Sequence, residues 1–282
     1  MNLNRFLRIL AIASLMTISA DVRGQATKGT VLEPTQANLA LTWSNASVVL
    51  PPGLAGGSRW QGALAEMPAP PTAERSPLVI MMHGSSGNAA FIKEYQNWLA
   101  EVLGLPSIAP DSMAIPGRLT YTSPIDKPTY ERVHALRLAE LRNAIAQAGA
   151  LPWVDPRRII VVGTSEGAVP VARLDDGQPV ARVIYAWSCE LNYFVEEPRT
   201  AIPKATPVLA MIAVKDPFFS SENPWNKDVA VNGTCAPALK DHASAMVVTL
   251  STNKHTIVNF PEARDVTASF LKRVLADGSR RP

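Results

Sequence analysis

The chain has 282 residues, of which 47% are hydrophobic and 18% charged, and its formal net charge is +3. This composition is ordinary for a globular protein and supplies enough apolar residues for a sizeable core. So small a positive charge does not indicate a nucleic-acid-binding surface, and no nucleic-acid partner is expected.

Residues 1–26 have the features of a signal peptide. Arg5 and Arg8 precede a mostly apolar run at 9–20, which is too short to span a bilayer. Candidate cleavage sites follow Ala20 and Ala26, and cleavage at the second leaves a net charge close to +1. The alternative is an amphipathic or anchoring helix, and no cysteine lies near enough for a lipoprotein anchor. We therefore expect an exported protein, periplasmic or secreted, without a stable membrane anchor, and a single domain over residues 27–282.

Strand and helix patterns alternate along the rest of the chain. Short antiparallel edge strands are predicted at 39–43, 47–50 and 60–65. Mostly apolar strands are predicted at 77–82, 106–110, 159–162, 179–187, 207–214 and 245–250. Helical spacing predicts helices at 91–103, 129–148, 168–174 and 261–275. This alternation favours an α/β fold with a mostly parallel central sheet and helices on both faces, whose sites lie at the carboxyl ends of the strands.

The most informative stretch is residues 158–168. Residues 159–162 are all β-branched, as in a strand that is buried on both faces. The next five residues, 163–167, fit G-x-S-x-G with Ser165 at the centre, and a helix can begin at Ala168. Strand, motif and helix in this order are the context that a nucleophile elbow requires. The alternative is a glycine-rich turn with a bystander serine.

Four segments resemble the α/β-hydrolase superfamily, and within it the dienelactone-hydrolase-like branch. They are VIMMHG at 79–84, PDS at 110–112, WVDPRRI at 153–159 and GTSEG at 163–167. The likeness covers roughly residues 38–276 and implies the α/β-hydrolase fold, with a triad in the order Ser, Asp, His. Two residues depart from the branch: Ser165 stands where its name-giving enzymes have cysteine, and Glu166 follows it. The resemblance therefore implies an ester or lactone hydrolase in the broad sense.

A serine nucleophile needs a base, and histidine suits because its ordinary pKa lies near working pH. Of the four histidines, His255 follows the last predicted strand in a polar loop and is the predicted base. His83 belongs to a His-Gly turn and is expected to brace the oxyanion loop. His134 lies inside a predicted helix, where we expect it at the surface, and His242 precedes the last strand, on the wrong side for catalysis.

The base needs a carboxylate to fix its tautomer. Asp216 ends an apolar strand and precedes Pro217, which makes a rigid corner, so it is the predicted partner of His255. Asp228 and Asp241, in the long segment that follows, remain alternatives.

An oxyanion hole requires two backbone N–H groups aimed at one point. The elbow supplies the N–H of Glu166, and the loop after the His-Gly turn supplies that of Ser85. Walls for the substrate are predicted in the irregular segments, at Tyr121, Trp187 and Phe218, each of which could instead belong to the core.

These residues predict a serine hydrolase that cleaves a carboxylic ester or lactone, in a small-molecule or polymeric substrate, through an acyl-enzyme. A peptidase or acyltransferase would use the same triad, and the alternative of another class is a non-catalytic binding protein on this fold. No cofactor or metal is expected, because the sequence has no ligand spacing, G-x-G-x-x-G or P-loop.

The chain has only two cysteines, Cys189 and Cys235, and an even count in an exported chain favours a disulfide. Both follow strands that should be neighbours, on the face that carries Ser165. The bond requires a Cα–Cα distance below about 7 Å. The alternative is two separate buried thiols.

Overall fold

The structure is a computed structural model that describes residues 27–278, apart from 69–73, 228 and 230. The signal peptide predicted at residues 1–26 lies outside the described residues.

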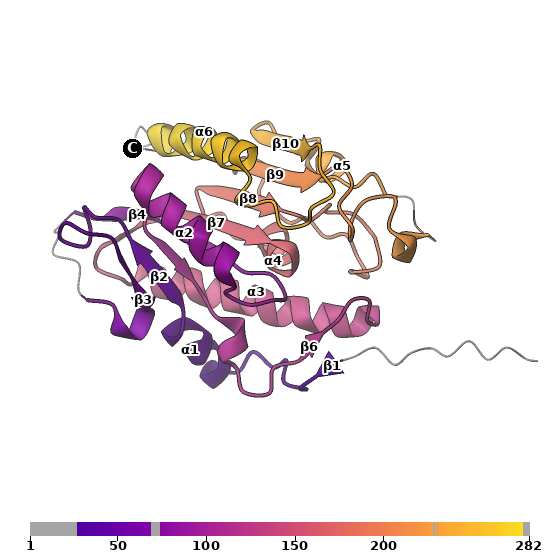
Figure 1. Cartoon of the computed structure of the whole chain (residues 1–282), viewed down its shortest axis with the longest axis horizontal. Helices are drawn as coiled ribbons and strands as arrows, with labels where there is room; N and C mark the ends of the chain where they lie inside the picture. Colours follow the sequence, from indigo (N-terminus) through magenta and orange to yellow (C-terminus); the bar gives the residue numbers. More distant parts are fainter. Residues whose placement is uncertain (1–26, 69–73, 228, 230, 279–282) are drawn as a thin grey trace, which may run out of the picture.

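The described residues form an eight-stranded sheet in the order β10-β9-β8-β7-β4-β5-β2-β3 (Figure 1). Neighbouring strands from β10 to β5 are parallel, whereas β2 is antiparallel to β5 and to β3 at the edge. The strands are β2 (Ser47–Leu50), β3 (Trp60–Ala63), β4 (Ser76–Met82), β5 (Ser107–Ala109), β7 (Val154–Thr164), β8 (Ala181–Tyr185), β9 (Val208–Ala213) and β10 (Ala245–Leu250).

Helices cover both faces of this sheet. They are α1 (Gln36–Ser44), α2 (Ala90–Leu103), α3 (Lys127–Gly149), α4 (Ala168–Arg173), α5 (Ala236–Leu239) and α6 (Pro261–Gly278). Because successive strand residues point to opposite faces, β7 serves two cores. Ile159 and Val161 pack on the side of α3 and α4, while Ile160 and Val162 pack on the side of α2 and α6. The mostly parallel sheet with helices on both faces is confirmed.

A second, two-stranded sheet lies beside the main one. In it β1 (Thr27–Lys28) pairs antiparallel with β6 (Thr120–Tyr121), so that Thr27 faces Tyr121. Single 3₁₀ turns follow β3, β5 and β7 and lie in the segment after β9: η1 (Leu64–Glu66), η2 (Ser112–Ala114), η3 (Ser165–Gly167) and η4 (Pro224–Asn226).

The strand predicted at 39–43 is wrong, because these residues belong to α1. The signal for a helix lies just before it: the Thr35 side chain caps the first turn by accepting the N–H of Asn38 at 3.1 Å. The segment predicted as a strand at 60–65 continues as a strand only to Ala63, after which η1 follows. The other predicted strands and helices differ from the observed ones only at their ends.

The predicted disulfide is present. Cys189 and Cys235 are bonded, with a Cα–Cα distance of 4.8 Å, and tie the segment after β8 to the segment after β9. The Glu190 carboxylate reinforces this tie by accepting the backbone N–H groups of Asn232 and Gly233. In the part of the chain that the structure describes, no helix has the length and apolar character needed to cross a membrane.

Candidate active site

Ser165 stands on a tight turn between β7 and α4. Its φ of 54° lies in the left-handed region, which non-glycine residues rarely adopt. A Cβ at Gly163 would lie 2.1 Å from the Gly167 carbonyl oxygen, and one at Gly167 would lie 2.3 Å from that of Met82. Neither position can therefore hold a larger residue, and the predicted strained elbow is present.

His255 and Asp216 are joined. The imidazole Nδ1 lies 2.8 Å from Oδ2 of Asp216, whose side chain is fully buried. The other carboxylate oxygen, Oδ1, accepts the N–H groups of Phe218 and Phe219 at 2.9 and 3.1 Å. The carboxylate is thus fixed from two sides, and it places the imidazole proton on Nδ1 and the lone pair on Nε2.

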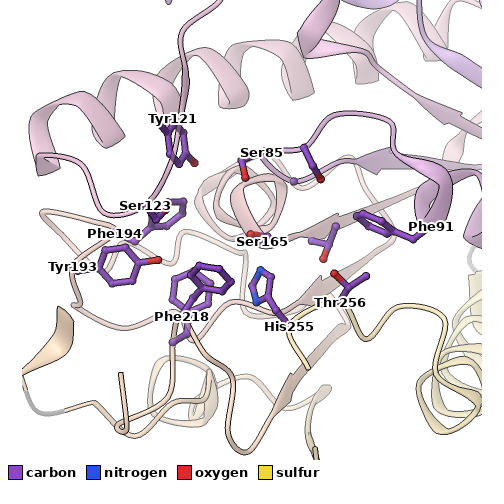
Figure 2. A pocket seen from close by; sticks show the side chains of 14 residues that line it. Ser85, Phe91, Tyr121, Ser123, Ser165, Tyr193, Phe194, Phe218, His255 and Thr256 are labelled. Carbon is purple, nitrogen blue, oxygen red and sulfur yellow. The ribbon is translucent and has the colours of Figure 1, made fainter. Parts of the chain in front are cut away.

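Ser165 and His255 line the same cavity, which has a volume of about 90 Å³ (Figure 2). Its walls are largely aromatic, with small hydroxyl side chains between the rings. Among the described residues that line it, none is Asp, Glu, Lys or Arg. The aromatic lining residues are Phe91, Tyr121, Tyr193, Phe194, Phe218 and Phe219, and the hydroxyl ones besides Ser165 are Ser85, Ser86, Ser123, Thr164 and Thr256.

The structure brings most of the predicted site residues to this cavity. Ser85, Tyr121 and Phe218 all line it. The loop that carries Ser85 runs over the elbow, because a Cβ at Gly84 would lie 3.3 Å from that of Ser165. Asp216 reaches the cavity only through His255.

The prediction that Trp187 forms a wall for the substrate is corrected, because this residue is not among those that line the cavity. Its side chain is 3% exposed and packs edge-on against Phe219, with ring centroids 5.1 Å apart. The chain after β8 bends through two non-glycine residues with positive φ, Ala186 at 50° and Cys189 at 56°. Trp187 thus supports Phe219 from behind, and Phe219 faces the cavity.

His83 braces the loop after β4, as predicted. Its Nε2 accepts the N–H of Ser112 at 3.0 Å, which leaves the proton on Nδ1, 2.6 Å from the Gly84 carbonyl oxygen. His134, predicted at the surface, is instead 1% exposed: its ring stacks on Tyr130 and its Nε2 lies 3.0 Å from the Phe194 carbonyl oxygen.

A buried cluster of charged residues surrounds the side chain of Glu166. One carboxylate oxygen accepts from Nη2 of Arg118 at 2.7 Å, and the other accepts from the Tyr121 hydroxyl at 2.7 Å. The Nε of Arg137 lies 3.4 Å from the first oxygen. Burial raises the pKa of Glu166, but the two guanidinium groups and the Tyr121 hydroxyl outweigh it and lower the pKa to about 2.

Sequence reasoning did not find this cluster, although one signal was present. In α3 the charged pair Arg137 and Glu140 stands on the same helical stripe as Val133, Leu141 and Ala144, all of which are buried. Charged residues on an apolar stripe indicate either an error in the pattern or a buried ion pair, and here they form the pair.

Solved structures share this fold. The chain is similar to TT1662 from Thermus thermophilus, at 18% identity and a TM-score of 0.50 over 72% of this chain and 90% of that one. A cold-adapted esterase from an Arctic intertidal metagenomic library matches at 16% identity and a TM-score of 0.50, over 76% and 86%. A putative dienelactone hydrolase from Klebsiella pneumoniae matches at 18% identity and a TM-score of 0.49, over 84% and 98%.

No family model and no curated protein matches the chain. The structural likenesses at a TM-score of 0.50, the sheet order and the elbow together show that the chain has the α/β-hydrolase fold. Within the described ranges, no group of three or more His, Cys, Asp and Glu side chains is placed to hold a metal ion.

Proposed function

We propose that this protein is an exported serine hydrolase that cleaves a carboxylic ester or lactone through an acyl-enzyme. One observation carries the proposal: the hydrogen-bonded pair of His255 and Asp216 opens onto the same cavity as Ser165, which stands on a strained elbow. A nucleophile, a base and a group that orients the base are the parts that acyl transfer needs.

Each residue has a role in the proposed reaction. The Ser165 hydroxyl attacks the ester carbonyl carbon while Nε2 of His255 takes the hydroxyl proton. Asp216 stabilises the imidazolium, which then gives the proton to the departing alcohol. A water molecule gives a proton to the same imidazole and attacks the acyl carbon; the bond from that carbon to the Ser165 oxygen then breaks, the imidazolium returns the proton to that oxygen, and the acid leaves. The backbone N–H groups of Ser85 and Glu166 are proposed to hold the oxyanion in both steps.

The cavity lining supports an uncharged acyl group. A substrate carboxylate placed here would lose its water and meet aromatic rings and hydroxyls, without an arginine or lysine among the described lining residues. The small volume favours a short acyl chain or a single ring, and the alcohol part can belong to a small molecule or a polymer. We expect p-nitrophenyl acetate, butyrate and benzoate to be hydrolysed faster than p-nitrophenyl hemisuccinate or a carboxylate-bearing lactone.

Labelling by a fluorophosphonate probe tests the proposed nucleophile. The wild type should be labelled and should hydrolyse a p-nitrophenyl ester, whereas Ser165→Ala should do neither while keeping its thermal unfolding temperature. Ser86→Ala is the matched control, because Ser86 lines the same cavity without a proposed chemical role, and it should still be labelled. A wild type that resists the probe and hydrolyses no ester or lactone would refute the proposal.

The export part of the proposal rests on the sequence of residues 1–26 and is consistent with the disulfide between Cys189 and Cys235. Expressed with its own leader in a Gram-negative host, the mature chain should begin near Asp21 or Thr27. Amino-terminal sequencing of the periplasmic and cytoplasmic fractions checks this. An intact Met1 in the cytoplasmic fraction would contradict it.

A further inference from the structure

The two proposed oxyanion donors come from different parts of the chain. Ser85 lies in the loop after β4, and Glu166 lies in the elbow after β7. An oxyanion hole works only when both N–H groups point at one atom, and a misplacement of about 1 Å can cost about 100-fold in rate. The positions of the Ser85 loop and the Glu166 elbow relative to each other must therefore be fixed by contacts between them.

The backbones of these loops meet at a point without side chains. Gly167 lies so close to the loop after β4 that a Cβ there would be 2.3 Å from the Met82 carbonyl oxygen and 2.4 Å from that of His83. This contact sets how near the loops approach. The parallel pairing of β4 with β7 fixes the offset of the two strands as far as Met82 and Gly163, and the loops that carry Ser85 and Glu166 lie beyond that last pair.

Arg137 connects the two loops beyond the end of the β4–β7 pairing. It lies in the middle of α3, is fully buried, and contacts both loops with one guanidinium group. Its Nη2 donates to the backbone carbonyl oxygen of His83 at 2.8 Å, two residues before Ser85. On the other loop, its Nε lies 3.4 Å from the carboxylate of Glu166, at ion-pair distance.

The third contact of Arg137 fixes its orientation. Nη1 donates to Oε2 of Glu140 at 2.6 Å, and the other oxygen of Glu140 accepts from the Ser112 hydroxyl at 2.6 Å. A guanidinium is a planar, rigid fork, so two hydrogen bonds in different directions leave it little freedom to rotate. They hold its Nε, which makes no hydrogen bond of its own, at ion-pair distance from Glu166. Lysine could make only part of these contacts, because its ammonium is a single point charge on a flexible chain.

We infer that Arg137 is a positioning residue, which holds the loop of Ser85 and the elbow of Glu166 at the offset that lets both amides bind one oxyanion. The inference rests on the proposed hydrolase function. It assigns to Arg137 no contact with the substrate, since Arg137 is not among the residues that line the cavity. Its loss should therefore weaken the transition state much more than the bound substrate.

Two variants test the inference by steady-state hydrolysis of a p-nitrophenyl ester and by inhibition with phenylboronic acid, which forms a tetrahedral adduct on a catalytic serine. Arg137→Lys keeps the charge and should lower kcat about 10-fold or more, with KM changed less than about threefold. The double variant Arg137→Met/Glu140→Gln removes one charge of each sign, so the cluster stays neutral, and should lower kcat by up to about 100-fold. The inhibition constant of the boronic acid should rise with the loss of kcat in both variants.

The control is Arg173→Met/Glu131→Gln. This pair joins α3 to α4 at the far end of α4 from the elbow, and each guanidinium nitrogen that contacts Glu131 meets a separate carboxylate oxygen. It should lower the unfolding temperature without changing kcat. If it lowers kcat as much as the Arg137 variants do, the effect comes from packing between the helices and the inference is wrong.

The remaining outcomes separate the inference from the function on which it rests. Arg137→Lys with the kcat and boronic acid affinity of the wild type would overturn the inference and leave the hydrolase intact; this variant also decides the matter should the double variant fail to fold. A parallel rise in KM with unchanged kcat would overturn it too, because it would mean that Arg137 acts on substrate binding. A wild type without esterase activity or fluorophosphonate labelling would overturn the proposed function and the inference together.

Discussion

The ring and the hydroxyl of Tyr121 belong to two different parts of the site. Its ring is part of the cavity wall, while its hydroxyl donates to the buried carboxylate of Glu166. The hydroxyl is therefore engaged in the charged cluster, and the ring forms an aromatic part of the cavity wall. Burial and Glu166 raise the pKa of the phenol well above its usual range, so the hydroxyl is protonated and remains a donor at neutral pH.

Tyr121→Phe should destabilise the protein by about 1–3 kcal/mol, because it leaves a buried carboxylate oxygen without that donor. Urea unfolding measures the change. Tyr185→Phe is the control: Tyr185 is fully buried, and its hydroxyl contacts the neutral hydroxyls of Thr267 and Tyr95 in place of a carboxylate. If Tyr121→Phe lowers the free energy of unfolding no more than Tyr185→Phe does, the charged partner of Tyr121 does not have the role given to it here.

Ser165, His255 and Asp216 should behave as one unit. Each alanine variant should lose most of kcat, and combining them should add little, because the remaining members cannot act without the missing one. His242→Ala is the control with near wild-type activity. The assignment fails if His242→Ala abolishes turnover while His255→Ala retains it.

At the scale of elements, the segment between β9 and β10 is held by more than its own short helix. It is bonded through Cys235 to Cys189, and the Asn226 side chain accepts the backbone N–H of Tyr193, an aromatic residue of the cavity. The disulfide therefore fixes the part of the chain from which one wall of the cavity is built.

Replacing both cysteines by alanine should lower the free energy of unfolding by about 4 kcal/mol, because the bond closes a long loop in the unfolded chain. The sequence separation of the two residues is 46. Denaturant unfolding with and without reductant measures it: the wild type should lose a similar amount in reductant, and the double variant should be insensitive to it. Two reactive thiols per chain in the denatured, unreduced wild type would contradict the bond.

The sequence was sufficient to predict those elements that have a clear pattern of apolar residues, either a continuous run or a helical period. Buried parallel strands have continuous apolar runs, and three polar residues just beyond their carboxyl ends, Ser165, Asp216 and His255, were predicted to lie near one another, as the structure has them. Helix α1 was misread because Thr42 alone among its residues is buried, so its apolar residues follow no core-facing period. Its Thr35 cap was the better guide.

Two features of the candidate site could not be predicted from the sequence. The direction of Trp187 depends on left-handed backbone conformations at Ala186 and Cys189, which residue type does not favour and which only the finished fold imposes. The partners of Glu166 come from as far as 48 residues away, and nothing in a single sequence relates Arg118 to the elbow.

For the whole molecule, buried neutral histidines make stability depend on pH. Burial lowers the pKa of His134 to about 4 and lowers that of His83 well below its usual range. Both should be neutral in the folded state near pH 6, whereas in the unfolded chain they titrate near 6.5. The unfolded state therefore binds more protons below pH 6.5, and acid shifts the equilibrium toward it.

We expect the free energy of unfolding to be constant near neutral pH and to fall as the pH drops from about 6.5 toward 4, by on the order of 3 kcal/mol for His134 alone. Glu166 adds a loss between its unfolded pKa, about 4.5, and its folded value of about 2. Urea unfolding at a series of pH values measures the slope, and His134→Gln should reduce it. Equal stability at pH 7 and pH 4.5 would rule out this origin of acid sensitivity.

Because Thr27 pairs with Tyr121, the residue at which a recombinant chain begins should affect the hydrolysis kinetics that are measured on it. A chain that begins at Leu32 lacks β1, and β6 then loses the partner that holds the backbone of Tyr121 in place. Such a shortened chain keeps every strand of the central sheet and every residue of the proposed triad. Its selectivity among acyl groups should nevertheless differ from that of a chain that begins at Thr27, so specificity measured on one version does not transfer to the other.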